Sequence, residues 1–393
     1  MRIESVDFYY LSMPTVLDIG DGSQDALLVR VQAGPHVGWG ECEAAPLPSI
    51  ASLVCPMSHS ACKPIIDSVR GQLIDSVADI KRIGDLVRAN SADMLQTDHT
   101  WSGIDIALWD LLGRRLDVPV YELLGFPRAY PKIPYASALF GNTPEQTLFK
   151  ARAIRAQGFQ AAKFGWGPFG CGSVADDALQ LAAAREGLGS EAELMVDVGM
   201  IWVEDVGAAA ARAAILRRSK VLWLEEPFVP GAHAAYRQLA ELVAPVRLAG
   251  GEGCHTVYHA LHMIEHAGLG YIQIDAGRIG GITAAHAVAN AAAACGVAYV
   301  NHTFTSHLAL SASIQPYAGL AEHRICEYPV ELKPLAIEMT TTHIRPNAEG
   351  EICLPEAPGL GIAPNLAALA RYLVDVEIKV RGKVIYQTPI LTT

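Results

Sequence analysis

The stretch Val221-Leu222-Trp223-Leu224-Glu225-Glu226-Pro227 decides how the rest of the sequence is interpreted. Apolar residues lead directly into two carboxylates and a proline, a pattern that indicates a buried strand ending beside a cavity. Alternation along a strand places Val221, Trp223 and Glu225 on one face and Glu226 on the other. A buried carboxylate is costly to keep charged without a partner, so we expect a cation near Glu225. The alternative for this stretch alone is a strand that ends at the surface with two solvated acids.

Short apolar strands alternate with helices from residue 133 onward. Strands are expected at 133–137, 160–164, 194–198, 221–225, 246–249, 271–275, 298–301 and 324–327. Helices are expected near 144–157, 174–187, 205–218, 231–243, 254–267 and 281–295, and a weaker one begins near 306. Eight strands with helices in nearly every gap are typical of a (β/α)8 barrel. We therefore predict an α/β fold in which residues 131–340 form the barrel.

Residues 1–130 are predicted to form an α+β unit. Segments 3–11, 26–32 and 37–41 alternate like antiparallel strands, and helices are expected at 65–88 and 102–112. Two irregular segments, 13–25 and 44–63, have the length of lids or binding loops, although solvated surface is an equal alternative. Residues 341–393 contain a late strand-like run at 374–386, and we expect this segment to pack back on the N-terminal unit.

The overall composition narrows the class of protein. The chain of 393 residues is 51% hydrophobic, and its formal charge of -11 without a Lys/Arg block argues against a nucleic-acid or anionic membrane surface. Eight scattered cysteines without a CxxC pair indicate reduced thiols, and no signal peptide or membrane span is visible. We therefore expect a cytoplasmic protein. A homo-oligomer and a small-molecule carboxylate partner are separate expectations that do not rest on composition.

An ionisable residue stands at the carboxyl end of each predicted barrel strand from the second to the eighth. In chain order these are Lys163, Asp197, Glu225, Glu252, Asp275, His302 and Glu327. The spacing from Asp197 to His302 runs 28, 27, 23 and 27 residues, close to the roughly 30 residues of one βα unit. Because barrel enzymes carry their chemistry at this end, we expect these side chains to face one site.

Three of these residues are predicted to bind a metal ion. Carboxylates converging from neighbouring strands repel one another unless they share a hard cation, and oxygen ligands without His or Cys favour Mg²⁺ over zinc. Asp197, Glu225 and Glu252 are therefore assigned as Mg²⁺ ligands. Three independent surface acids are the alternative.

The next two strand ends indicate acid/base chemistry. Asp275 beside His302 would fix the imidazole tautomer and raise its basicity, as a general acid/base requires. Lys163 could neutralise a substrate carboxylate, or act as a base if burial lowers its pKa. His307 is the alternative histidine if the register of the seventh strand differs.

These residues resemble the mandelate racemase branch of the enolase superfamily. The resemblance rests on Lys163, Asp197, Glu225 of Glu-Glu-Pro, Glu252 of Gly-Gly-Glu, Asp275 of Asp-Ala-Gly-Arg-Ile-Gly-Gly, His302 and Glu327, together with the helix-like run 102–110. It implies a capping domain whose loops close over a Mg²⁺ site, with Glu327 among the catalytic residues. It also implies removal of the proton α to a carboxylate, with the metal stabilising the enediolate.

Two departures from the family pattern bear on the reaction. Gly165 occupies the second position of the Lys-x-Lys pair that racemases carry, so a base on the second face of the α carbon is missing. Gly199 stands where the family often has a substrate-contacting Asn. We therefore predict dehydration of a hydroxylated acid, an acid sugar, to a 2-keto-3-deoxy acid. A racemase, epimerase or cycloisomerase is the alternative, and a binding protein without catalysis is more remote.

Three further features have weaker functional interpretations. Trp166, in a glycine-rich loop after the second strand, is predicted to line the substrate pocket, with a structural role as the alternative. His59, in the segment 44–63, is a candidate substrate contact, although loop histidines are usually solvated. His255, His259, His262 and His266 follow helical spacing; the stripe could bind a transition metal, but a solvated or interface stripe is the favoured interpretation.

Overall fold

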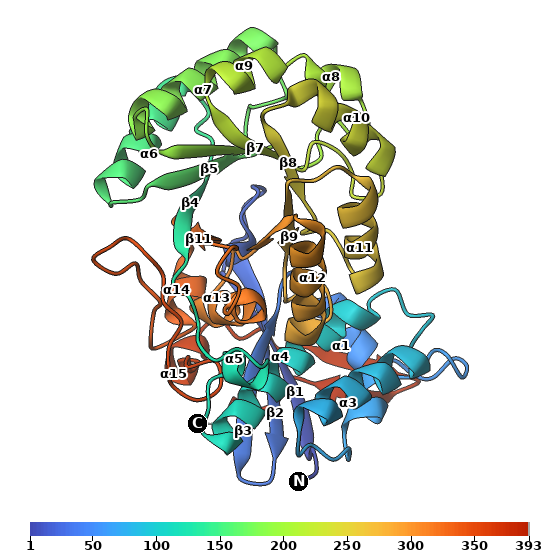
Figure 1. Cartoon of the computed structure of the whole chain (residues 1–393). Helices are drawn as coiled ribbons and strands as arrows, with labels where there is room; N and C mark the ends of the chain where they lie inside the picture. The colour runs from blue at the N-terminus through green and yellow to red at the C-terminus, as the bar shows by residue number, and fades with distance from the viewer. Residues whose placement is uncertain (392–393) are drawn as a thin grey trace.

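The apolar runs from residue 133 onward form one parallel sheet of eight strands that curls into a barrel. The computed structural model describes residues 1–391 of the chain (Figure 1). The strand order is β10-β9-β8-β7-β6-β5-β4-β11. The strands are β4 (Ile133–Leu139), β5 (Ala161–Gly165), β6 (Glu193–Asp197), β7 (Val221–Glu225), β8 (Arg247–Gly250), β9 (Tyr271–Ile274), β10 (Ala298–Asn301) and β11 (Ile325–Pro329). The predicted α/β barrel is confirmed.

Helices on the outside of the barrel fill most gaps between the strands (Figure 1). They are α6 (Pro144–Ala156), α7 (Val174–Leu188), α8 (Val206–Ala210), α9 (Ala213–Arg218), α10 (His233–Val243), α11 (Val257–His266), α12 (Gly281–Cys295) and α13 (His307–Ile314), followed by the 3-10 turn η2 (Gln315–Tyr317). The single helix predicted at 205–218 is wrong in one respect, because the chain breaks it between Ala210 and Ala213.

A side chain links the strands at the two ends of the sheet order, β10 and β11. The Asn301 amide donates to the Glu327 carbonyl at 3.4 Å, and its oxygen accepts from the Glu327 backbone N–H at 3.0 Å. The Tyr317 hydroxyl donates to the same Asn301 oxygen at 2.9 Å. Asn301 thus supplies the donor and the acceptor that a neighbouring backbone would offer, and it holds the end of β11 beside β10.

The inside of the barrel is filled by side chains beneath the strand ends. Tyr135, Met195, Trp223, Ala249 and Val300 are buried and pack together there. The rings of Tyr135 and Trp223 meet edge to face with centroids 5.3 Å apart. This layer closes the barrel interior, so a ligand is confined to the carboxyl end of the strands.

The N-terminal residues form the predicted α+β unit, an antiparallel sheet covered by helices. Its strands are β1 (Ser5–Ser12), β2 (Asp25–Ala33) and β3 (His36–Cys42), in that order, and η1 (Gly22–Gln24) precedes β2. The helices are α1 (Pro46–Val54), α2 (Ile65–Val69), α3 (Val77–Asn90), α4 (Thr97–Leu116) and α5 (Val120–Leu123). Helix α4 lies directly on β3, where a Cβ at Gly40 would stand 2.1 Å from the Gly103 carbonyl oxygen. Glycine at both positions lets the two backbones approach this closely.

Three expectations for this unit are corrected by the structure. The predicted helix at 65–88 is two helices, because the chain turns at Gly71 (φ +84°) and α3 starts anew from a capping box at Ser76. The segment 44–63 is only partly irregular, since α1 begins at Pro46, the first helical position, where proline loses no hydrogen bond. Helix α4 is longer than the predicted 102–112.

The C-terminal segment lies against the sheet of the N-terminal unit. Its elements are α14 (Pro334–Glu338), α15 (Leu366–Leu369), β12 (Glu377–Val380) and β13 (Lys383–Gln387). The Ser12 N–H donates to the Tyr372 carbonyl at 2.9 Å, and the Tyr386 hydroxyl donates to the Phe8 carbonyl at 2.6 Å. The run predicted at 374–386 is a hairpin of two strands. Within residues 1–391, no helix has the length and apolarity needed to cross a membrane.

Candidate active site

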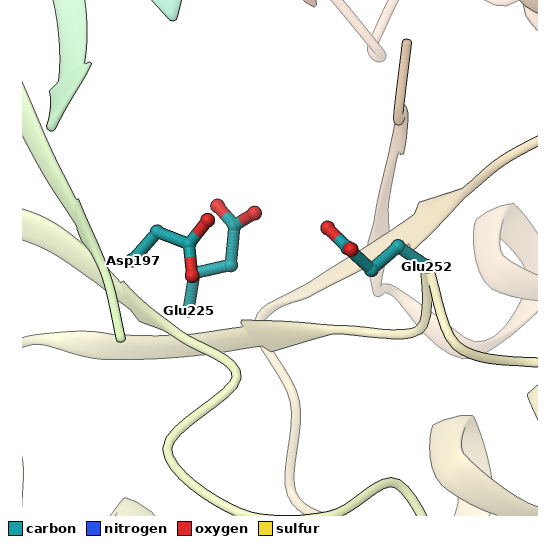
Figure 2. Close-up of side chains that lie close together, drawn as sticks. All are labelled: Asp197, Glu225 and Glu252. Carbon is teal, nitrogen blue, oxygen red and sulfur yellow. The ribbon is translucent and has the colours of Figure 1, made fainter. Parts of the chain in front are cut away.

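Three carboxylates meet at the carboxyl ends of adjacent barrel strands. Asp197 ends β6, Glu225 ends β7, and Glu252 follows β8. One oxygen of each lies within 4.8 Å of the others. Figure 2 shows Asp197 and Glu225 side by side, with the Glu252 carboxylate pointing toward them. The alternative of three independent surface acids does not apply, because Glu225 is fully buried and Asp197 is 5% exposed.

The backbone and an indole hold two of these carboxylates in place. Asp197 and Glu225 are direct partners in the parallel register of β6 and β7. The Trp223 Nε1–H donates to Glu225 Oε2 at 2.9 Å, and the Gly199 N–H donates to Asp197 Oδ1 at 2.9 Å. Trp223 and Glu225 share a face of the strand, as alternation predicts, so the barrel core orients the carboxylate.

The electrostatics of the cluster favour an added cation. Burial raises the pKa of Glu225 to about 8; Lys163 opposes this increase, and repulsion from Asp197, Glu327 and Glu252 adds to it. Burial likewise raises the pKa of Asp197. Buried carboxylates that repel one another are neutralised by protons or by a metal ion. Oxygen donors without a nearby Cys or His ligand fit a hard divalent ion such as Mg²⁺.

Lys163 of β5 is bound by the carboxylates on its side of the site. Its Nζ lies 2.5 Å from Glu225 Oε1, 2.9 Å from Glu327 Oε1 and 3.5 Å from Asp197 Oδ2. Burial lowers the pKa of Lys163, but Glu225 and Glu327 outweigh it and hold this pKa well above the ordinary value. Of the two roles predicted for Lys163, the geometry favours a fixed positive charge over a base.

Asp275 and His302 form a hydrogen-bonded pair on the opposite side. The His302 Nδ1–H donates to Asp275 Oδ2 at 2.7 Å, and the Gly277 N–H donates to Asp275 Oδ1 at 2.6 Å. His302 Nε2 is left facing Glu252 Oε2 at 3.2 Å. Burial lowers the pKa of His302, but Glu252, Glu327 and Asp275 outweigh burial and raise it to about 10. Nε2 is therefore the nitrogen available for proton transfer.

Glu226 differs from its neighbour in role. It is 2% exposed, and its backbone is left-handed with φ +43°. Its Oε1 has no hydrogen-bond partner among the described residues. Burial and the charges of Glu252 and Asp197 raise its pKa well above the ordinary value. Glu226 is therefore buried beside the three carboxylates in surroundings that disfavour its charged form.

A cavity of about 280 Å³ lies above these groups, between the barrel and the N-terminal unit. Trp166 lines it and is 44% exposed. The indole passes between Gly20 of the N-terminal unit and Gly199 of the barrel, where a Cβ would stand 2.8 Å from the ring on either side. The remaining lining residues are Ile19, Gly20, Asp21, Gly22, Glu43, Ala44, Ser137, Ala138, Leu139, Lys163, Gly165, Asp197, Glu252, Arg278, His302, Phe304 and Glu327.

The sequence analysis missed the contacts by which the N-terminal unit completes this cavity. Arg278 forms an ion pair with Glu43, and its Nη1 lies 3.5 Å from Glu252 Oε1. Glu41 accepts a hydrogen bond from Ser306 at the start of α13. The spacing of Glu41 and Glu43 along one strand face was the available signal. Their partners lie more than 230 residues away, which periodicity does not reveal.

Two predicted histidine contacts are not at the cavity. His59 Nε2 lies 3.4 Å from Asp93 Oδ2 at the surface of the N-terminal unit, so the solvated alternative describes its position in the structure. His307 is buried and stacks on His343 with centroids 4.6 Å apart. The alternative register at the seventh strand is therefore unnecessary, because His302 already faces Asp275.

Comparisons with known proteins agree with this architecture. Residues 147–368 match the enolase C-terminal domain-like family, and residues 9–125 match the mandelate racemase / muconate lactonizing enzyme N-terminal domain. These matches define a two-domain enzyme of the enolase superfamily. Within that superfamily, the chain belongs to the mandelate racemase / muconate lactonizing enzyme family.

Individual relatives differ in reaction. A crystal structure described as a predicted mandelate racemase from Rhodobacter sphaeroides is 60% identical, has a TM-score of 0.95 and covers 99% of this chain and 100% of that one. D-galactarolactone cycloisomerase of Agrobacterium fabrum is 28% identical over 86% of this chain and 88% of its own. D-galactonate dehydratase of Variovorax paradoxus is 31% identical over 54% of this chain and 56% of its own.

Proposed function

We propose that the protein is a Mg²⁺-dependent dehydratase that converts a hydroxylated carboxylic acid, an acid sugar, to a 2-keto-3-deoxy acid. One observation carries the proposal: the cavity has an acid/base group on one wall only. His302 with Asp275 forms that wall, whereas the other wall holds Gly165 and the ammonium of Lys163. A racemase needs a base on each face of the α carbon, but an elimination proceeds with one.

Asp197, Glu225 and Glu252 would hold the Mg²⁺ ion. When bound, the ion would stabilise the negative charge that develops on the substrate carboxylate as the α proton leaves. The three carboxylates supply only oxygen donors, and the elevated pKa values of Glu225 and Asp197 indicate a site short of positive charge. These features support a hard divalent ion at this position.

Lys163 would bind and orient the substrate carboxylate. Its ammonium lies on the same side as Glu225 and Asp197, it lines the cavity, and it is kept protonated by its carboxylate partners. An ammonium in a buried site strengthens binding of an anion because little water competes. Glu327 would position Lys163, since its Oε1 lies 2.9 Å from Nζ.

His302 would move both protons of the elimination through Nε2. As a base it takes the proton from C2, and as an acid it returns a proton to the hydroxyl that leaves from C3, so the C3–O bond breaks and water departs. The resulting enol loses the proton of its C2 hydroxyl and takes up a proton at C3, and so becomes the 2-keto acid. Asp275 holds Nδ1–H and stabilises the imidazolium between the two steps. If the charge of Glu252 is neutralised, the pKa of His302 should fall toward neutral pH, because Glu252 contributes most to raising it.

A screen with Mg²⁺ tests the proposal. The purified protein is incubated with a panel of mono- and diacid sugars that includes D-galactonate and D-gluconate, the acids named for two dehydratase relatives. Formation of a 2-keto-3-deoxy acid is followed with semicarbazide. The account expects keto acid with at least one panel member, none after EDTA treatment, and none from His302→Asn. Consumption of an acid with no keto acid from any member would refute it.

Cycloisomerisation is the second candidate, because D-galactarolactone cycloisomerase covers 86% of this chain. It also begins with α-proton transfer on one face, so the same His302–Asp275 pair could serve. A lactone panel separates the two candidates. Conversion of galactarolactone to a product of unchanged mass, without turnover of any open-chain acid, would favour the cycloisomerase.

A further inference from the structure

The stripe of histidines divides into two groups in the structure, because His255 precedes α11 whereas His259, His262 and His266 lie within it. His255 turns toward the N-terminal unit, where its ring lies 6.5 Å from that of His99. The other three turn toward the first residue of α10, His233. Figure 1 shows α10 and α11 next to each other on the outside of the barrel. The sequence stripe therefore gains a partner from a second helix that helical spacing alone does not reveal.

Four imidazoles gather at this position. The ring centroid of His233 lies 6.1 Å from that of His259 and 6.2 Å from that of His262, and the rings of His262 and His266 are 5.2 Å apart. His259, His262 and His266 are spaced i, i+3 and i+7, so they lie on one face of α11. We call these four residues the outer histidine cluster.

His233 has the character of a metal ligand. Its Nε2 is buried and has no hydrogen-bond partner among the described residues. Burial, with repulsion from His259, His262 and His266, lowers the pKa of His233, while the Pro230 carbonyl opposes the decrease as a hydrogen-bond acceptor. A neutral imidazole whose other nitrogen is held by a carbonyl presents a lone pair, which is the form that binds metals.

We propose that the outer histidine cluster is a second metal site, which binds a borderline divalent ion such as Zn²⁺ through His233 and the His259, His262 and His266 face of α11. Imidazole ligands select such ions, whereas the carboxylate site selects Mg²⁺. Two histidines one helical turn apart on one face are a zinc-binding arrangement. The site is separate from the proposed reaction, since none of the four residues lines the catalytic cavity.

The rings of the outer histidine cluster need to move only slightly to bind one Zn²⁺ ion. Two imidazoles on a tetrahedral Zn²⁺, with Zn–N distances of about 2.0–2.1 Å, have ring centres about 5 Å apart. The pair His262 and His266 already matches this separation, and the His233 pairs exceed it by about 1 Å. Within residues 1–391, only the carboxylate cluster has donor atoms already within 4.8 Å of one another. His262 and His266 are exposed, so their rings can turn inward.

Isothermal titration of Zn²⁺ into the full chain tests the site. Saturating Mg²⁺ occupies the carboxylate cluster, and the exposed thiols of Cys171, Cys295 and Cys353 are first alkylated. One Zn²⁺ per chain is expected to bind. His233→Asn and His262→Asn should each weaken binding at least about tenfold, since even loss of an outer-shell partner typically costs that much.

His255→Asn is the matched control, because it removes an exposed histidine just before the same helix that lies outside the cluster. It should leave the Zn²⁺ affinity unchanged, and thermal unfolding without Zn²⁺ should show that all three variants fold. The proposal is overturned if saturable Zn²⁺ binding is absent, or if His233→Asn and His262→Asn bind Zn²⁺ as tightly as His255→Asn does.

Discussion

The two walls of the catalytic cavity are built from the same kinds of charged residue but differ in what those residues can do. On one wall, His302 makes one firm hydrogen bond to Asp275 and leaves Nε2 facing the cavity. On the other wall, Lys163 contacts three carboxylates and keeps its proton. Carboxylate neighbours raise the pKa of both groups, yet only His302 leaves a nitrogen facing the cavity without a carboxylate closer than 3.2 Å. In the proposed reaction, the number and placement of these neighbours would determine which group moves protons and which supplies a fixed positive charge.

Of the variants considered, His302→Asn should reduce activity most. Asparagine keeps a polar group of similar reach but has no titrating nitrogen, so kcat for keto-acid formation should fall roughly 10²- to 10⁴-fold. Exchange of the substrate α proton with D₂O should be lost in parallel, because one nitrogen serves both. If exchange persists in His302→Asn at the wild-type rate, the base lies elsewhere.

Glu41→Gln tests the support behind the His302 wall. Burial raises the pKa of Glu41 from 4.5 to about 7, although the hydrogen bond from Ser306 opposes it. The folded protein therefore holds a proton that the unfolded chain releases between these values, so Glu41 lowers stability as pH rises from 4.5 to about 7. This shift in pKa corresponds to a loss of about 3 kcal/mol at most in the free energy of unfolding.

Replacing Glu41 by the neutral Gln should remove the loss of stability that occurs as the pH rises. Thermal unfolding at pH 5 and pH 8 measures it: the variant should gain a few degrees of Tm over wild type at pH 8 and little at pH 5. An equal change at both pH values would show that packing rather than ionisation is responsible.

Lys163→Met tests whether Lys163, on the opposite wall, binds the substrate carboxylate or transfers a proton. Methionine fills similar volume without charge, so KM should rise by about tenfold or more as the charge-assisted contact to the substrate carboxylate is lost. Exchange of the α proton at saturating substrate should continue, since Lys163 is not the base. Loss of exchange at saturation, with Mg²⁺ affinity unchanged, would assign proton transfer to Lys163.

Gly165→Ala is expected to have the smallest effect. Its added Cβ would stand 3.2 Å from both Cβ and Oδ2 of Asp197, which is tight but not prohibitive. Pressure on this carboxylate should weaken Mg²⁺ binding by a few-fold at most, an amount worth under about 1 kcal/mol. Calorimetric titration of Mg²⁺ checks this, with Gly231→Ala as a remote glycine control, since an added Cβ there meets nothing within 4 Å.

The sequence predicted those parts of the molecule that depend on local periodicity. Each barrel strand was expected within one or two residues of its bounds, because apolar runs, turn residues and polar strand ends recur along the chain. The strand ends also indicated which side chains meet, since parallel strands bring their carboxyl ends to one rim. Glu225 and Asp197 are register partners for this reason.

Features that depend on contacts between distant segments were not predictable. The ion pair of Glu43 with Arg278 joins two domains, and no spacing rule links residues 235 apart. The protonation of Lys163 depends on three partners whose distances only the folded chain sets. Loop composition gives no direction for the His59 side chain, which the structure turns toward Asp93.

The stereochemistry of α-proton exchange tests the central claim most directly. The panel acid that yields most keto acid is incubated with enzyme and Mg²⁺ in D₂O, and the unreacted substrate is recovered and analysed by NMR at partial conversion. A single acid/base wall predicts that any deuterium at C2 enters with retention of configuration and that the product is the 2-keto-3-deoxy acid. Recovery of substrate deuterated in both C2 configurations would show that a second base operates on the Lys163 wall, and would contradict the account.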